Sequence, residues 1–209
     1  MKNNIEIKHD INLKISKLRA GEFELIVEFP YDEPGILYKI SAVLYIRNWN
    51  ILELIATPSD ADGVFDKFVI KSMESGPIFL VQKALLMSDL RYILKKEVSV
   101  SQYLMFFKEK RKTGINMIYS QPVVHVTKSK KEKNILIIKI FASDRPGLIF
   151  SVVEVLYHLY FNISSMRSDT KQNIAYDEIV VQRDLDKVSE NDEKILKESL
   201  KNVLQLQAG

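Results

Sequence analysis

The sequence contains no cysteine, one tryptophan, three histidines and only seven glycines in 209 residues. Without cysteine the chain cannot form a disulfide framework, a catalytic thiolate or a cysteine-ligated zinc site. The histidines, His9, His125 and His158, are too widely spaced to suggest a metal centre. We therefore expect neither a metal nor a cofactor.

Long apolar runs are also absent. No stretch approaches the roughly 18 uncharged apolar residues that cross a membrane, and the opening residues MKNNIEIKHD lack the apolar segment of a secretory signal. Hydrophobic residues make up 46% of the chain and charged residues 27%, which is typical of a globular protein. We expect a cytoplasmic protein with no membrane partner and with room for two cores of roughly 90 residues each.

The net charge of +3 is unevenly distributed. Eight basic residues lie in one segment, against two glutamates: Lys108, Lys110, Arg111, Lys112, Lys128, Lys130, Lys131 and Lys133. Such a segment could contact nucleic acid, but the aromatic residues that stack on bases are not interleaved with it. We interpret it as a solvated linker and a lysine-rich turn, and we do not expect a nucleic-acid partner.

An internal repeat dominates the sequence. A shift of 112 positions places Pro34-Gly35 on Pro146-Gly147 and Asn50-Ile51 on Asn162-Ile163. Between these pairs the apolar residues coincide at a spacing near 3.6, which predicts the same helix twice. They are Ile36, Leu37, Ile40, Val43 and Leu44 in the first copy, and Leu148, Ile149, Val152, Val155 and Leu156 in the second. Agreement over some 40 residues indicates a duplication.

Each copy can be divided into strands and helices. Strands are predicted before the Pro-Gly turn and, as a pair, after the helix, and a second helix follows. The predicted strands are Phe23–Phe29, Ile51–Thr57 and Val64–Lys71 in the first copy, with Ile135–Phe141 opening the second. The last of these is apolar nearly throughout, so we expect both its faces to be covered. The second helix is expected to start near Pro77 in the first copy and after VSEND in the second.

A further strand is expected in front of each copy, at Ile5–Lys8 and at Val123–Thr127. The fold class is therefore α+β, with two ferredoxin-like units in tandem, either βαββαβ or permuted ββαββα. We place the first domain at residues 1–98, a linker at 99–121 and the second domain at 122–209. The linker carries a predicted helix over Ser99–Lys112, capped by Ser99 or Ser101.

The repeated turn brings together groups that suit an amino acid. A helix N-terminus favours a carboxylate, glycine permits close approach to the backbone, and Asp32 or Asp144 could accept from an ammonium group. Asn50 and Asn162 open the following strand with an amide that both donates and accepts. A purely structural interpretation remains open, in which the aspartates cap the helix and the glycines permit tight packing.

The pattern [DN]-x-P-G-[LIV], an apolar helix and then Asn-Ile at a strand resembles the ACT domain, a small-molecule-sensing module. Two copies joined by a basic linker are similar in particular to the C-terminal ACT pair of the uridylyltransferases that modify the nitrogen-signalling protein PII. The resemblance implies paired domains that bind an amino acid at their interface, with glutamine as the first candidate, and a protein partner or a homodimer. It implies these ligand-binding positions: Asp32, Gly35, Ile36 and Asn50 in the first unit, and Asp144, Arg145, Gly147, Leu148 and Asn162 in the second.

The two copies differ from this family pattern in places. Where the second turn has Arg145, the first has Glu33, whose charge should disfavour a carboxylate, so the second turn is expected to be the better site. Family members end the helix on a left-handed glycine; Asn48 suits that conformation, but Tyr160 does not, so we expect the second helix to end differently.

Enzymatic activity is not expected. No nucleophile and base occur in a defensible pattern, and we interpret Asp66 and the Asp177-Glu178 pair as exposed strand positions. An alternative to the sensor is an interaction module without a small ligand. It would use apolar residues expected to be exposed: Ile138, Ile140, Met105, Phe106 and Phe107.

Overall fold

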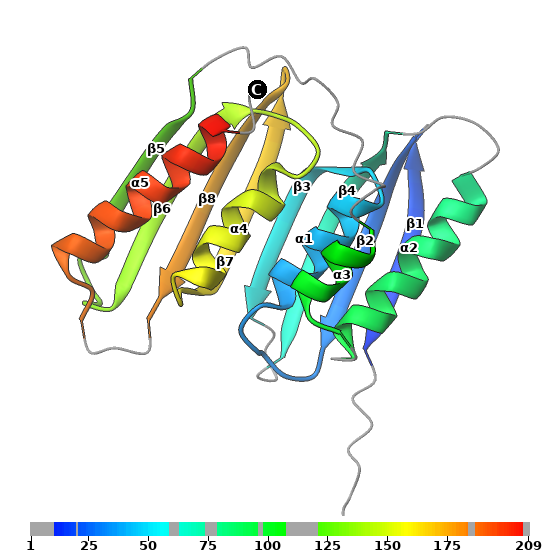
Figure 1. The fold of residues 1–209 in the computed structure, drawn as a ribbon, viewed down its shortest axis with the longest axis horizontal. Helices are drawn as coiled ribbons and strands as arrows, with labels where there is room; N and C mark the ends of the chain where they lie inside the picture. Colours follow the sequence, from blue (N-terminus) through cyan, green and yellow to red (C-terminus); the bar gives the residue numbers. More distant parts are fainter. Residues whose placement is uncertain are drawn as a thin grey trace, which may run out of the picture.

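The computed structural model describes residues 11–19, 21–58, 63–73, 79–95, 98–107, 121–183 and 187–206, and in these the chain folds as two ββαββα repeats (Figure 1). The first repeat consists of β1 (Asn12–Arg19), β2 (Glu22–Phe29), α1 (Ile36–Ile46), β3 (Trp49–Pro58), β4 (Val64–Ser72) and α2 (Phe79–Leu94). The short helix α3 (Val100–Phe106) follows. The second repeat consists of β5 (Val123–Lys128), β6 (Ile135–Ser143), α4 (Leu148–His158), β7 (Asn162–Lys171), β8 (Ile174–Gln182) and α5 (Glu190–Leu206).

All these strands form one antiparallel sheet in the order β1-β2-β4-β3-β7-β8-β6-β5. The repeats meet where β3 pairs with β7, and there Ile55 lies opposite Arg167. These two residues are equivalent under the 112-residue shift, so an approximate two-fold axis passes between them. The α+β class and the ferredoxin-like units are therefore confirmed, in the permuted strand order.

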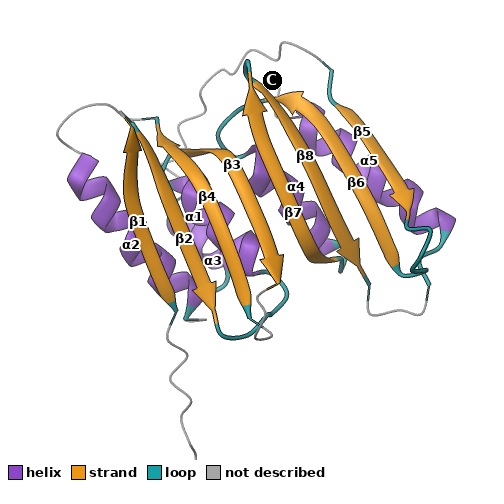
Figure 2. Ribbon diagram, turned by 180° about the vertical axis from the view of Figure 1, so that it is seen from behind, coloured by secondary structure: helices purple, strands orange, loops and turns teal. Residues whose placement is uncertain are grey.

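The helices cover one face of the sheet, and the strands lie in front when the molecule is viewed from behind (Figure 2). In β6, Leu136, Ile138 and Ile140 are buried on the helix-covered face, whereas Lys139 and Phe141 alternate with them and are exposed. The expectation that both faces of this strand are covered is wrong, and so is the expectation that Ile138 and Ile140 are exposed. A run of apolar residues indicates that a strand is buried, but it does not show whether one face of the strand or both faces are covered.

Strand β1 (Asn12–Arg19) pairs with β2 at the edge of the sheet, and this segment was not predicted as a strand. Leu13 and Ile15 alternate along it and pack against the core, and Gly21, at φ 77°, turns the chain into β2. In the second repeat the predicted Val123–Thr127 strand is confirmed as β5, which pairs with β6. The predicted Ile5–Lys8 strand and the start near Pro77 lie outside the described residues.

Helix α3 begins at the predicted cap. The Ser99 hydroxyl accepts from the backbone of Gln102, whose side chain reaches back to the Ser99 N–H. Val100 and Tyr103 are buried against the first repeat, while Met105 and Phe106 are 75% and 74% exposed. Phe107 is only half-buried, and residues 108–112 of the predicted helix lie outside the described residues. The domain limits 1–98, 99–121 and 122–209 remain a prediction.

Both central helices end on a left-handed residue, Asn48 at φ 58° and Tyr160 at φ 59°. The expectation that the second helix ends differently is wrong. The N–H of Phe161 donates to the Leu156 carbonyl at 2.9 Å, and the N–H of Tyr160 to that of Tyr157 at 3.1 Å. These bonds satisfy terminal carbonyls, and the buried Phe161 ring anchors the turn, which holds Tyr160 in a conformation it disfavours alone.

Among the residues that the structure describes, no helix combines the length and apolar character needed to traverse a bilayer. Within the same residues, three or more histidine, aspartate or glutamate side chains are nowhere grouped in a way that could hold a metal ion.

Candidate ligand site between the repeats

The glycine of each turn lies beneath a tyrosine of the other repeat. A Cβ on Gly35 would come within 2.7 Å of the Tyr157 ring, and a Cβ on Gly147 within 2.5 Å of the Tyr45 ring. Both glycines are left-handed, at φ 93° and 84°, immediately before α1 and α4. The backbone conformation and the ring contact together explain why glycine occupies these positions, without any ligand.

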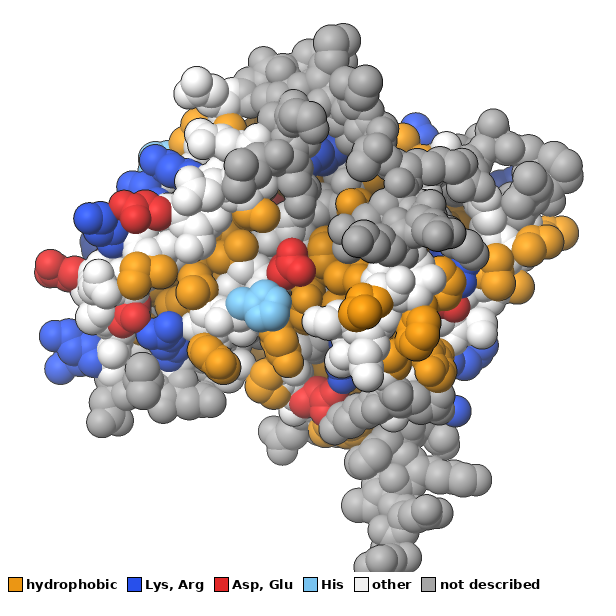
Figure 3. Space-filling view, in the orientation of Figure 1, with side chains coloured by type: hydrophobic (Ala, Val, Ile, Leu, Met, Phe, Trp, Pro, Cys, Tyr) orange, Lys and Arg blue, Asp and Glu red, His pale blue; other side chains and the backbone are white. Residues whose placement is uncertain are grey.

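Aromatic stacking between α1 and α4 holds the repeats together. The Tyr38 ring stacks on Phe150 at 5.7 Å and on Tyr157 at 4.9 Å, and the Tyr45 ring stacks on Phe150 at 5.3 Å. The Tyr38 hydroxyl donates to Oε1 of Glu154 at 3.3 Å. Apolar side chains gather along this boundary on the helix-covered face (Figure 3).

The first turn borders an open cavity of about 340 Å³. Its opposite wall comes from the second repeat, at the end of α4 and the start of β7. The residues lining it are Asp32, Glu33, Pro34, Gly35, Ile36, Leu37, Tyr38, Ala56, Thr57, Pro58, Val64, Asp66, Val153, Tyr157, Phe161, Asn162, Ile163, Ser164, Ser165 and Gln182. The cavity thus joins Asp32, Gly35 and Ile36 to Asn162 rather than to Asn50.

The second turn is closed by the protein's own side chains. The Nδ2 of Asn50 donates to Oδ2 of Asp144 at 2.7 Å, and Arg145 beside them is only 5% exposed. About 10 Å³ of space remains next to Asn50, Asp144, Arg145, Gly147 and Leu148. The expected grouping of Asp144 and Gly147 with Asn162 is therefore wrong, because each asparagine lies across the boundary from its own turn. The second turn, expected to be the better site, also has far less free space than the first.

The two turns differ in one charged residue, Glu33 in the first and Arg145 in the second. Glu33 was expected to disfavour a ligand carboxylate and so to make the second turn the better site, but Glu33 is paired and Arg145 is buried. Glu33 forms an ion pair with Lys39 at 3.0 Å, so its charge is neutralised beside the open cavity. Arg145 instead lies buried next to Asp144, and burial lowers the pKa of Arg145 while Asp144 and Tyr45 oppose that change. Burial raises the pKa of Asp144, and the Asn50 hydrogen bond acts against that rise.

Two buried aspartates were missed by sequence reasoning. Asp66 is 2% exposed and Asp177 is 3% exposed, so their interpretation as exposed strand positions is wrong, whereas Glu178 is exposed as expected. The signal was available, because Asp66 is in phase with Phe68 and Ile70 on the buried face of β4. Burial, followed by the nearby charge of Asp32, raises the pKa of Asp66 to about 7. Burial likewise raises the pKa of Asp177 to about 7, and neither of its carboxylate oxygens has a hydrogen-bond partner among the described residues.

Ser164 is a further cavity residue that was not identified from the sequence. The Ser164 hydroxyl oxygen is buried without a hydrogen-bond partner in the described part of the chain, and the residue lines the open cavity. It occupies the β-bulge of β7, where the register shifts between Ile163 and Ser165. Its counterpart in the bulge of β3 is Leu52. No sequence motif distinguishes such a bulge position.

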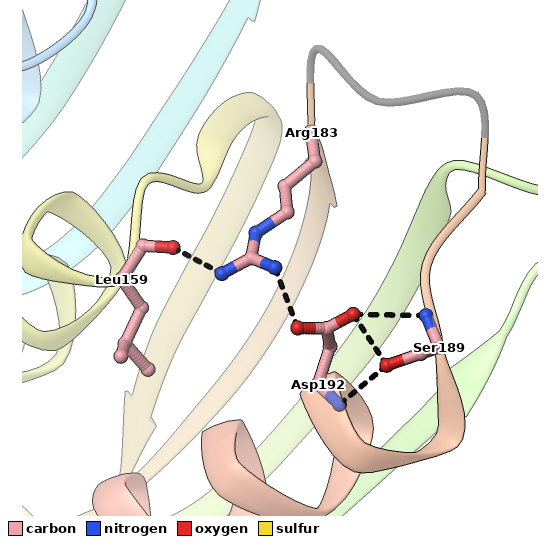
Figure 4. Close-up of polar contacts among 4 residues, drawn as sticks. All are labelled: Leu159, Arg183, Ser189 and Asp192. Carbon is pink, nitrogen blue, oxygen red and sulfur yellow. Dashed lines mark hydrogen bonds and ion pairs between the residues drawn. The ribbon is translucent and has the colours of Figure 1, made fainter.

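A polar network supports the far wall of the cavity (Figure 4). Arg183 follows the cavity residue Gln182 and donates to the Leu159 carbonyl at 2.8 Å and to Oδ1 of Asp192 at 2.5 Å. Its guanidinium lies 4.5 Å from the centre of the Phe161 ring, which lines the cavity. Asp192 also accepts from the N–H and hydroxyl of Ser189, at 2.9 and 2.6 Å, so the start of α5 is tied to the end of α4.

Comparison with known proteins finds similarity to ACT-like domains in the second repeat. Residues 123–205 match the family model described as the plant bHLH transcription factor ACT-like domain. Residues 123–205 are therefore an ACT-like domain, a regulatory module, and the first repeat is related to this unit by the internal duplication.

One known protein aligns with a longer part of the chain than the family model does. The chain is 25% identical over 140 residues to the bifunctional uridylyltransferase/uridylyl-removing enzyme of Rhodospirillum rubrum, an alignment that covers 66% of this chain and 15% of the relative. Its fold is similar to that in the crystal structure of aspartate kinase from Synechocystis, with a TM-score of 0.50 and 13% identity, over 88% of this chain and 27% of the kinase chain. The chain therefore spans only a small part of the length of either protein.

Proposed function

We propose that this chain is a regulatory sensor that binds one free amino acid in the open cavity between its two ACT-like repeats. The observation that carries the proposal is the 340 Å³ cavity itself, which joins the Asp32 turn of one repeat to Asn162 of the other. A cavity of this volume accommodates a small molecule. The closed second turn leaves no comparable space, so one ligand per chain is expected.

The groups around the cavity complement a zwitterion. The N-terminus of α1, which has no acidic residue in its first turn, favours a carboxylate. Asp32 and Asp66 offer acceptors to an ammonium group, and Asn162 can both donate to and accept from an amide side chain. Glutamine, the ligand implied by the resemblance to uridylyltransferases, remains the first candidate.

Regulation would follow from the position of the cavity. A ligand there contacts both α1 and α4, so it can favour one packing of the repeats over another. Such a shift requires that the ligand bind one packing more tightly. In this proposal the chain is not an enzyme; a protein partner or a second copy reads the change, in nitrogen or amino-acid metabolism.

The proposal is tested by thermal unfolding of the full chain with each of the twenty proteinogenic amino acids at millimolar concentration. At least one should raise the melting temperature, by about 5 °C at a hundredfold excess over the dissociation constant. Asn162→Ala should abolish that rise, because it removes the polar group facing the Asp32 turn. If no amino acid changes the melting temperature, the proposal is wrong.

The second candidate, an interaction module without a small ligand, is favoured by the exposed apolar residues of α2 and α3. Leu80, Met105 and Phe106 are each about three-quarters exposed. In that case Met105→Lys with Phe106→Lys would alter the oligomeric state measured by light scattering, and no amino acid would stabilise the protein.

A further inference from the structure

We infer that the open cavity selects its ligand through an ammonium group bound between Asp32 and Asp66. Primary amines without a carboxylate should therefore bind there, whereas acids without the amine should not. The inference takes its location from the proposed function, but it assigns the dominant recognition to the amine.

The charge of the cavity wall supports this assignment. Among the described lining residues the charged side chains are Asp32, Glu33 and Asp66, and no lysine or arginine is present. Lys39 already neutralises Glu33 at 3.0 Å. The two aspartates thus remain as an acidic pair that attracts a cation.

Asp66 is a buried carboxylate in the cavity wall. It is buried to 98% of its surface and lines the cavity, and its pKa is raised by burial and by the charge of Asp32, with no hydrogen bond among the causes. A buried carboxylate without a partner is unfavourable. An ammonium group in the cavity would supply such a partner.

Ionisation of Asp66 links binding to pH. Burial and the neighbouring Asp32 raise the pKa of Asp66 to about 7, so the carboxyl is partly protonated at neutral pH. A ligand ammonium favours the charged carboxylate and displaces that proton. Amine binding should therefore weaken about tenfold or more between about pH 8 and pH 5.5.

The duplicated fold offers a matched control. Asp177 occupies the corresponding position in β8, is equally buried and has a pKa raised to about 7. It lies beside Asp144 and the closed turn, away from the open cavity. Asp177→Asn therefore removes a similar buried charge without touching the proposed amine site.

The test uses three compound series with the full chain. Each series contains an amino acid, the amine that lacks its carboxylate and the acid that lacks its amine. The series are glutamine, 4-aminobutanamide and glutaramic acid; leucine, isoamylamine and 4-methylpentanoic acid; and phenylalanine, phenethylamine and 3-phenylpropanoic acid. Binding is followed by amide chemical shifts in nitrogen-15-labelled wild type, Asp66→Asn and Asp177→Asn.

In at least one series the amine should bind at least tenfold more tightly than the acid. Asp66→Asn should weaken that binding at least tenfold, and Asp177→Asn should leave it unchanged. The inference is overturned if the acid binds as tightly as the amine, if Asp66→Asn has no effect, or if nothing binds. Amines that bind without their amino acids would support the inference and contradict the proposed function. Amino acids that bind equally to wild type and Asp66→Asn would do the reverse.

Discussion

The side-chain amide of Asn50 donates to the carboxylate of Asp144 at 2.7 Å, from the first repeat to the turn of the second. The corresponding residues across the boundary, Asn162 and Asp32, instead border an open cavity of about 340 Å³. One duplicated pattern has therefore produced one closed turn and one open turn. The turns differ at one charged position: Arg145 is buried beside the closed turn, and Glu33 pairs with Lys39 beside the open one.

The Asn50–Asp144 bond should stabilise the fold. Asn50→Ala removes the donor from a largely buried carboxylate, so we expect a loss of about 1–3 kcal/mol in the free energy of unfolding. Urea denaturation at neutral pH measures the loss. Asn162→Ala, at the equivalent position of the open site, should cost less. Equal losses of unfolding free energy in the two variants would show that the Asn50–Asp144 hydrogen bond does not stabilise the fold.

Stability should fall as the pH rises from about 4 to about 7. The pKa values of Asp66 and Asp177 are about 7 in the folded protein and near 4 in an unfolded chain. The folded state therefore binds protons more tightly, and stability is lost between about pH 4 and pH 7 and remains low above that range. The loss from each carboxyl is on the order of a few kcal/mol.

The double variant Asp66→Asn, Asp177→Asn should remove this dependence. Its amides stay neutral, so it should be more stable than wild type at about pH 8 and similar to it near pH 4. Denaturant titrations at several pH values would show the difference. An identical decline with pH in wild type and variant would mean that other groups are responsible.

Filling the open cavity should stabilise the protein and block the ligand. Ser164→Leu introduces the residue that occupies the equivalent bulge, Leu52, and removes a buried hydroxyl without a partner in the described chain. We expect a gain of about 1 kcal/mol and loss of any response to amino acids. The opposite substitution at the equivalent position of the first repeat, Leu52→Ser, should destabilise the protein. A Ser164→Leu protein that still responds would place the ligand elsewhere.

The network around Arg183 should matter more than exposed ion pairs. Arg183→Met removes the hydrogen bonds to Oδ1 of Asp192 and to the Leu159 carbonyl, so we expect a loss of about 1–3 kcal/mol in the free energy of unfolding. The control is Lys139→Met, which breaks an ion pair with Glu178 whose side chains are more than half exposed and should cost less than about 1 kcal/mol. Urea denaturation compares them, and equal losses would contradict the assignment.

The local pattern was sufficient to predict most elements of the fold. The apolar spacing after each Pro-Gly predicted α1 and α4, and of the two predicted caps, Ser99 and Ser101, the structure has Ser99. Strand β1 was missed although Leu13 and Ile15 alternate with polar residues, which is the pattern of a half-buried strand.

The site was harder to predict, because its composition depends on how the repeats pair. Asn162 reaches the Asp32 turn only because β3 and β7 join the two repeats into one sheet, and no sequence periodicity specifies that pairing. Asp66 could have been recognised as inward-facing from its phase with Phe68. Its proximity to Asp32 depends on the tertiary fold.

The most direct measurement is the stoichiometry of ligand binding. The amino acid that gives the largest thermal shift is titrated calorimetrically into wild type, Asn162→Ala and Asn50→Ala. We expect one bound molecule per chain in wild type and in Asn50→Ala, and none in Asn162→Ala. Two molecules per chain, or binding that is lost in Asn50→Ala and kept in Asn162→Ala, would contradict an open site formed by Asp32 and Asn162.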